Sequence, residues 1–191
     1  MKATRNSISS KIHVDIVRVE SRAADFGFRH ASIGDLTEGI KLAESLMASK
    51  IATPEAVMRM DVVTGMTAWV TGRPVDGIFL VLPLSPAGEQ AVRDGTYHPA
   101  DPAPAHLAWH GRDVAGVYIG VYAGATKEAR RVVMTAAAVM RVELFAQVPS
   151  FARGATEDGK RSMASLGFSP LEGGLPDLWV QEPLSTGSEA A

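Results

Sequence analysis

The architecture of this chain follows from the stretch Val114-Ala-Gly-Val-Tyr-Ile-Gly-Val-Tyr122 and the residues after it, up to Ser150. This first segment is almost entirely apolar, which is typical of a buried strand. After the turn Ala123-Gly-Ala125 the apolar residues change to helical spacing, on a face made of Ala129, Val132, Val133, Ala136, Ala137 and Met140. The segment 142–148 is strand-like again, and Pro149 ends it. Two strands joined by a helix predict a parallel crossover unit.

The turn places Gly124 at the start of the predicted helix. The first N–H groups of a helix lack partners, and the helix dipole makes this end electropositive, so a glycine here would let a phosphate approach the backbone. A single glycine more often marks a plain tight turn, and that interpretation stays open. On the strand before it, Gly116, Tyr118, Gly120 and Tyr122 alternate and are expected on one face. Glycines inside a strand indicate close approach of a ligand or of a packed helix.

The order of elements and three short motifs resemble the GNAT superfamily of acyl-CoA-dependent N-acetyltransferases. The motifs are Phe28-Arg-His-Ala-Ser-Ile-Gly-Asp35-Leu at the opening strand and helix, Val121-Tyr-Ala-Gly124-Ala-Thr126 at the pyrophosphate loop, and Ser165-Leu-Gly167-Phe168 before the last strands. The resemblance extends from Phe28 to Pro183. It implies an α/β (α+β) fold, in which a central mixed and mostly antiparallel twisted sheet has one parallel strand pair around the β-loop-α crossover and helices on both faces.

Three positions depart from the family's pattern. Val121 stands where the family prefers Gln or Arg, and Thr126 stands where it prefers Gly or Ala. Met163 stands where a tyrosine commonly protonates the leaving thiolate, and a methionine cannot donate a proton. These departures favour an alternative, a GNAT-fold protein that binds a ligand or partner without catalysis. A further alternative is an α/β domain of another family, which would lack a splayed cleft between the two strands of the crossover unit.

The leading hypothesis is direct transfer of an acetyl group from acetyl-CoA, as co-substrate, to an amine acceptor that is a small molecule or a peptide. The resemblance implies that the turn holds the pyrophosphate and that a backbone N–H of the strand 117–122 holds the thioester carbonyl. The expected cofactor-binding residues are Ile119, Val121, Ala123, Gly124, Ala125, Thr126 and Lys127. The candidate catalytic residues are Tyr118, Tyr122 and His110. The tyrosines would replace the missing proton donor, and the imidazole would be a base that Asp113 orients.

The remaining elements are predicted from local signals. Before the crossover unit we expect an extra strand or partner-packing arm at Ile12–Val19, helices at Asp35–Ser49 and from Thr53-Pro54 to about Gly65, and an antiparallel hairpin of Met66–Val70 and Ile78–Leu84. If the resemblance holds, Met47, Met58 and Met60 line an apolar pocket, although core filler is the commoner role of methionine. After the unit we expect a short helix at Thr156–Leu166 and strands at Phe168–Leu171 and Leu178–Val180.

The segment Ser85–Asp113 is expected to be a long loop, because it holds four prolines and three of the five histidines. His106 and His110 have the spacing of two metal ligands on one helix face, but no acid lies between them and no metal site is predicted. Residues 1–10 and 185–191 are expected to be flexible, and residues 11–184 to form a single domain.

The composition excludes several classes of function. A net charge of −2 gives no broad attraction to nucleic acid, and the lack of cysteine excludes disulfides, thiolate metal sites and a cysteine nucleophile. No segment approaches the ~20 apolar residues of a membrane span, and no signal-peptide pattern opens the chain, so no membrane partner and a cytoplasmic location are expected. Edge strands near the chain ends leave room for a homodimer.

Overall fold

The computed structural model describes residues 11–47, 50–154 and 156–184. The predicted flexible ends, 1–10 and 185–191, lie outside these residues. A seven-stranded sheet has the order β1-β2-β3-β4-β5-β7-β6, and only β4 and β5 are parallel. The strands are β1 Arg29–His30, β2 Ala68–Thr71, β3 Gly77–Leu84, β4 Gly116–Gly124, β5 Ser150–Arg153, β6 Ser169–Pro170 and β7 Leu178–Gln181.

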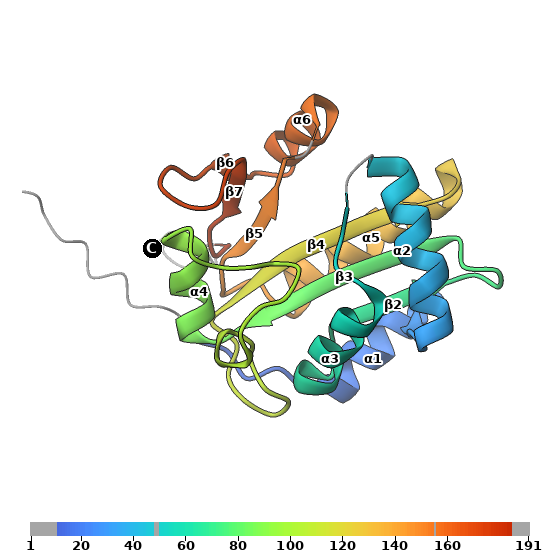
Figure 1. Ribbon diagram of the computed structural model, residues 1–191, viewed down its shortest axis with the longest axis horizontal. Coiled ribbons are helices and arrows are strands. Elements are labelled where there is room, and N and C mark those ends of the chain that lie inside the picture. Colours follow the sequence, from blue (N-terminus) through green and yellow to red (C-terminus); the bar gives the residue numbers. More distant parts are fainter. Residues whose placement is uncertain (1–10, 48–49, 155, 185–191) are drawn as a thin grey trace, which may run out of the picture.

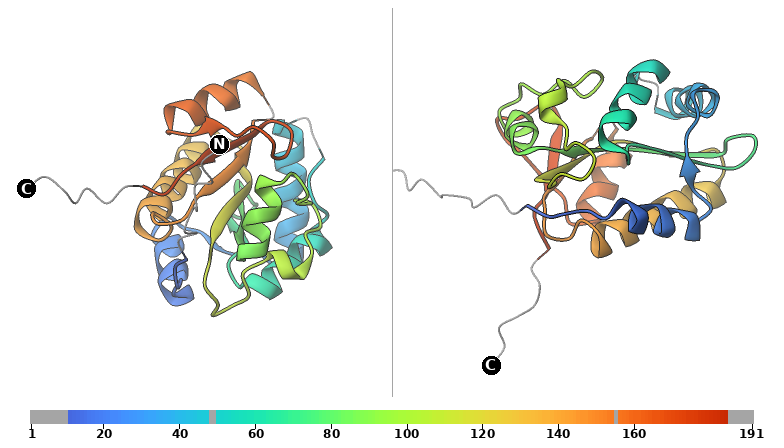
Figure 2. Two further views of the ribbon diagram at one scale, coloured as in Figure 1. Left: turned by 90° about the vertical axis from the view of Figure 1, so that its left-hand side faces the viewer. Right: turned by 90° about the horizontal axis from the view of Figure 1, so that it is seen from below.

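Helices cover both faces of the sheet (Figure 1). They are α1 Ile16–Asp25, α2 Ile33–Met47, α3 Pro54–Thr64, α4 Pro86–Arg93, α5 Lys127–Glu143 and α6 Glu157–Ser165, with a 3-10 turn at Pro104–His106. Seen along the sheet, α2, α3 and α4 lie on one side and α1 and α5 on the other (Figure 2). This mixed, mostly antiparallel sheet with one parallel pair confirms the fold class predicted from the sequence. In the described part of the chain, no helix is long and apolar enough to cross a membrane.

The crossover unit is present, but its second strand lies later than predicted. The helix α5 continues to Glu143, and β5 begins at Ser150, after Pro149. The apolar segment 142–148 is therefore the last turn of a helix and the loop after it, so the predicted strand there is wrong. Phe145 and Val148 are buried in the core beneath α5. A short apolar run looks alike in a strand and in a packed helix end, so spacing alone did not separate the two.

The predicted strand at Ile12–Val19 is also wrong. Only Ile12 pairs with the sheet region, through two backbone hydrogen bonds with Val114. The side chain of Asp15 accepts a hydrogen bond from the Val17 N–H at 3.0 Å and caps α1. This cap starts a helix whose Val19 faces the core. The alternation of apolar and polar residues over Ile12–Val19 resembled a strand, although its second half forms the first turn of α1.

The segment 85–113 begins with helix α4, so its prediction as one long loop is wrong for the first third, and most of the remainder is a loop with a short 3-10 turn. Ser85 caps α4 by accepting a hydrogen bond from the Gly88 N–H at 3.1 Å, and Pro86 occupies the first turn. Tyr97 and Leu107 anchor the rest of the segment in the core. The same cap-and-proline signal correctly predicted α3, which begins after Thr53.

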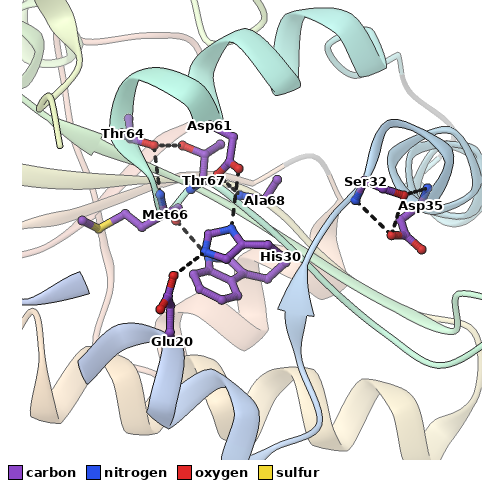
Figure 3. A network of polar contacts seen from close by, with 10 residues as sticks. Glu20, His30, Ser32, Asp35, Asp61, Thr64, Met66, Thr67 and Ala68 are labelled. Atoms are coloured by element: carbon purple, nitrogen blue, oxygen red, sulfur yellow. Dashed lines mark hydrogen bonds and ion pairs between the residues drawn. The ribbon is translucent and has the colours of Figure 1, made fainter. Parts of the chain in front are cut away.

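A polar network ties three elements together at the β1 edge of the sheet (Figure 3). His30 on β1 lies 3.3 Å from the Glu20 carboxylate on α1 and 3.6 Å from the Asp61 carboxylate on α3. Its ring stacks on Trp69, with 4.1 Å between the ring centroids. The hydrogen bond with Asp61 is the main cause that raises the pKa of His30. The other Asp61 oxygen accepts the N–H groups of Thr67 and Ala68, so the network fixes the start of β2.

Candidate functional site

Strands β4 and β5 separate shortly after they begin. Their pairing joins only 117–119 to 150–152, whereas β4 runs on to Gly124 along β3. Figure 1 shows the two strands diverging as a V. The V holds a cleft of about 300 Å³, lined by Leu46, Met47, Ile119, Gly120, Val121, Tyr122, Met134, Ala152, Arg153, Thr156, Gly159, Ser162, Met163, Leu166 and Phe168. A cleft at this place favours the GNAT-like interpretation over an unrelated α/β domain.

A bulge in β4 lies where the strands separate. Leu80 of β3 is opposite Val121, but the next residue, Val81, is opposite Ile119. Gly120 is therefore an extra residue in β4, and its backbone is left out of the regular ladder. The bulge reverses the alternation of side chains for the rest of the strand.

The two candidate tyrosines consequently face opposite sides of the sheet. Tyr118 is buried with the core under α2, α3 and α4, whereas Tyr122 packs with the core under α1 and α5. The prediction that both share a face is wrong, because strand parity holds only without a bulge. Tyr122 lies edge-to-face on Phe79, with 5.5 Å between ring centroids.

A second cavity of about 290 Å³ meets the cleft from the α2–α3 side. We call it the acceptor-side cavity, after the role proposed for it below; its lining is Met47, Lys50, Ile51, Ala52, Val57, Met60, Thr67, Leu80, Leu82, Pro99, Ala100, Tyr118, Ile119, Gly120, Arg153 and Asp177. It shares Met47, Ile119, Gly120 and Arg153 with the cleft. Of the three methionines considered for an apolar pocket, Met47 and Met60 line this cavity and Met58 does not.

Tyr118 and Tyr122 differ in their surroundings. Burial raises the pKa of Tyr118 to about 12, and the nearby charge of Arg153 lowers it slightly. Burial also raises the pKa of Tyr122, and here the opposing charge is Arg141. Both phenols therefore stay protonated at neutral pH. Tyr118 lines the acceptor-side cavity together with Arg153, whereas Tyr122 lines the cleft.

His110 lies elsewhere. The backbone N–H of His110 donates to the Val63 carbonyl at 2.9 Å, and its exposed imidazole ring covers Gly65 at the end of α3. It lines neither the cleft nor the acceptor-side cavity. Asp113, the residue expected to orient it, instead lies 3.9 Å from His13. Within the described residues, no group of three or more His, Asp or Glu side chains could hold a metal ion.

The glycine of the turn is required by packing. A Cβ atom built on Gly124 would lie 2.4 Å from the Arg130 nitrogen and 2.7 Å from the Ala129 carbonyl carbon. The end of β4 therefore lies directly against the first turn of α5, which favours the plain tight turn. Thr126 caps this helix by accepting the Ala129 N–H at 3.1 Å, and the Ala125 N–H donates to the Asp76 carbonyl at 2.7 Å.

The first turns of α5 nevertheless present positive charge. Lys127, Arg130 and Arg131 surround a surface hollow together with Glu128 and Met134. Met134 also lines the cleft, so the hollow lies next to the cleft's α5 wall. On α6, Lys160 is paired with acidic side chains: it lies 3.0 Å from Glu157 and 3.5 Å from Asp177.

The structure thus distributes the predicted cofactor residues along one path. Ile119 and Val121 line the cleft, Ala123 and Gly124 end β4, Ala125 and the cap Thr126 follow it, and Lys127 begins α5. Sequence reasoning missed Met134, Arg153 and Asp177, which contribute to the cavities from α5, β5 and the turn before β7. No local signal marks them, since each reaches the site only through the crossover and the β5–β7 pairing.

Comparison with known proteins places this fold among distant neighbours. No protein-family model matches the chain, and no curated protein matches it in sequence. Among solved structures, the chain is similar to the crystal structure of Ard1 from Thermoplasma volcanium, over 83% of this chain and 97% of that chain. The TM-score is 0.47 and the sequence identity 14%. At this distance the activity of Ard1 does not transfer to this chain.

Proposed function

We propose that the protein is a GNAT-like acyltransferase that transfers an acyl group, in the simplest case acetyl, from a coenzyme A thioester to an amine. The observation that carries this proposal is the junction at Ile119 and Gly120, where the cleft and the acceptor-side cavity meet. Direct transfer requires a donor and an acceptor to reach one point from two sides. A strand that lines both cavities meets that requirement.

The residues beside the cleft fit a coenzyme A donor. Its phosphates carry negative charge, and Lys127, Arg130 and Arg131 at the start of α5 supply positive charge there. Its pantetheine arm is long and largely apolar, and the cleft walls offer Leu46, Met134 and other apolar side chains. The thioester would then lie at the junction.

The chemistry at the junction is a simple exchange of bonds. The amine nitrogen attacks the thioester carbon, a C–N bond forms, and the C–S bond breaks. A backbone N–H at the bulge of Gly120 would stabilise the oxyanion, because the bulge leaves that backbone outside the ladder. Tyr118, protonated and beside Arg153, would give its proton to the leaving thiolate, and the proton that the attacking amine loses would return to Tyr118 through solvent. His110 has no role in this proposal.

The acceptor-side cavity indicates an amine on an apolar body. Its walls are mainly aliphatic and methionine side chains, and its charged rim is Lys50, Arg153 and Asp177. The Asp177 carboxylate, which also lies 3.5 Å from the Lys160 ammonium, would attract the acceptor's ammonium group. Asp177 has a backbone φ of 56°, in the left-handed region, so its position at the rim is set by an uncommon turn.

A second candidate function is ligand binding without catalysis. It is favoured by Met163, which lines the cleft where the family's proton donor would stand. It predicts coenzyme A binding with no thiol release in the presence of any amine.

Calorimetric titration with coenzyme A and acetyl-CoA tests the proposal. We expect micromolar binding to the wild type and a loss of about tenfold or more in Arg130→Ala/Arg131→Ala, because two charges near the phosphates are removed. Arg18→Ala, an exposed cation on α1, is the matched control and should bind as the wild type does. Thiol release from acetyl-CoA with phenethylamine, leucine amide and a short peptide then separates the two functions. No binding to the wild type at millimolar ligand would overturn both.

A further inference from the structure

A third cavity of about 300 Å³ lies on the other face of the sheet, between the strands and α5. We call it the back cavity. Its walls include Val81 and Val117 from the strands, Ala137 and Met140 from α5, and Phe145 from the loop that follows. It lies on the side of the sheet opposite to the acceptor-side cavity.

The back cavity lies next to the cleft. The two share Ile119, Tyr122, Met134, Leu166 and Phe168 in their linings. The acceptor-side cavity, by contrast, shares only Ile119 with it. A thioester held at the junction would therefore have the back cavity next to it, on the side of the sheet away from the acceptor-side cavity.

Arg141 and Gln181, two of the polar side chains that line the back cavity, already donate hydrogen bonds to other protein groups. All three nitrogens of the Arg141 guanidinium donate hydrogen bonds: to the Gln181 side chain at 2.8 Å, to the Phe145 carbonyl, and to the Glu182 carbonyl at 3.0 Å. The Gln181 amide nitrogen donates in turn to the Leu166 carbonyl at 2.7 Å. A charged or polar occupant would lose its water without gaining these partners, so the cavity suits a hydrocarbon.

We propose that the back cavity takes the acyl chain of the donor, so that the preferred donor is a medium-chain acyl-CoA rather than acetyl-CoA. This inference rests on the proposed function. The cavity volume of about 300 Å³ is roughly ten times the share of one water in the liquid, which gives room for several methylene groups. The acetyl group alone would leave this apolar space unfilled.

The test is a calorimetric series with coenzyme A and its acetyl, butanoyl, hexanoyl and octanoyl thioesters. Burial of one methylene group corresponds to about 0.8 kcal/mol, or about fourfold in Kd. We therefore expect butanoyl-CoA to bind the wild type roughly fifteenfold more tightly than acetyl-CoA, with a further gain for hexanoyl-CoA.

Two variants test whether the acyl chain of the donor lies in the back cavity. Ala137→Leu fills the buried wall of the cavity, and Ala138→Leu narrows it from a more exposed lining position, so it tests the same space if the first variant folds poorly. Both should remove the gain with chain length and leave coenzyme A binding within about twofold of the wild type. Thr135→Leu adds the same side chain to an exposed position of α5 that does not line the cavity, and should keep the gain.

The outcomes separate the two proposals. If coenzyme A and acetyl-CoA bind but longer chains bind no more tightly, the acyl-chain site is overturned and the proposed function stands. A gain with chain length that persists in both Ala137→Leu and Ala138→Leu also overturns the site. If no thioester and no free coenzyme A bind, the proposed function itself fails.

Discussion

Tyr118 and Tyr122 of β4 lie on opposite faces of the sheet, because Gly120 bulges between them. Tyr118 borders the junction of the cleft and the acceptor-side cavity, close to Arg153. Tyr122 lines the cleft and the back cavity, close to Arg141. One strand thus gives its two phenols to two separate compartments.

Tyr118→Phe should lower kcat by about a hundredfold, since a positioned proton donor typically contributes this much. The phenol is protonated at neutral pH because burial raises its pKa to about 12. Coenzyme A affinity should hold within about twofold, since Tyr118 lines the acceptor-side cavity and not the cleft. Thiol release under saturating donor measures the effect. A variant with wild-type kcat would remove Tyr118 from the proposed chemistry.

Tyr97→Phe is the matched control for Tyr118→Phe, and this variant should also stabilise the protein. The Tyr97 ring lies 5.3 Å from the Tyr118 ring, is 1% exposed, and its hydroxyl has no hydrogen-bond partner among the described residues. Removal of an unpaired buried hydroxyl should raise the free energy of unfolding by about 1 kcal/mol and Tm by about 2–4 °C. Thermal unfolding followed by circular dichroism measures this. A lower Tm would indicate that the hydroxyl has a partner, such as a buried water.

Gly124→Ala should destabilise the fold by about 1–3 kcal/mol, because the new Cβ atom would contact the α5 backbone at Arg130 and Ala129. Gly34→Ala is the control: its Cβ atom would meet only the Ser32 hydroxyl at 3.8 Å, and alanine favours helix α2 by up to about 1 kcal/mol. Urea unfolding compares the two. Equal stability of Gly124→Ala and the wild type would show that α5 can move away from β4 at little cost.

His30 should stabilise the protein more at low pH than at high pH. Its pKa is raised, mainly by the hydrogen bond with Asp61 and further by Glu20. Its stabilising contribution is therefore complete below its unfolded pKa of about 6.5 and is lost as pH rises through the higher folded value. Because the pair of His30 and Asp61 is partly exposed to solvent, it should contribute no more than about 1 kcal/mol to the free energy of unfolding.

Unfolding of the wild type and of His30→Gln between about pH 5.5 and pH 8.5 tests this. The difference in the free energy of unfolding between the wild type and His30→Gln should shrink as pH rises. Parallel curves would mean that His30 does not titrate in this range, and that its stacking on Trp69, rather than its charge, fixes the network.

Elements with strong local signals were predictable from the sequence. Helical spacing from Ala129 to Met140 identified α5, and hydroxyl caps at Thr53, Thr126 and Thr156 each mark a helix start in the structure. Capping side chains were also present at Ser85 and Asp15, but the prolines after Ser85 suggested a loop, and the apolar alternation of Ile12–Val19, which runs across Asp15, suggested a strand. These errors concern competing local signals and did not affect the fold class.

The geometry of the candidate site was less predictable, because it depends on pairing between distant segments. The bulge at Gly120 is visible only in the register of β4 against β3, since one extra residue does not alter the composition of a strand. Arg153 and Asp177 come together through the β5–β7 pairing. The sequence predicted a turn at Ala123–Ala125, whereas the structure keeps Ala123 and Gly124 in β4 and gives Gly124 a packing role against α5.

The bulge also limits which mutations β4 can accept during evolution. A substitution along the strand changes one wall of one compartment. A change in length at Gly120 would turn Val121, Tyr122 and Ala123 each to the opposite side of the sheet, and would place a phenol where α2 packs and aliphatic groups where α5 packs. Related chains should therefore vary in the side chains that line the three cavities and keep the residue count of this strand unchanged.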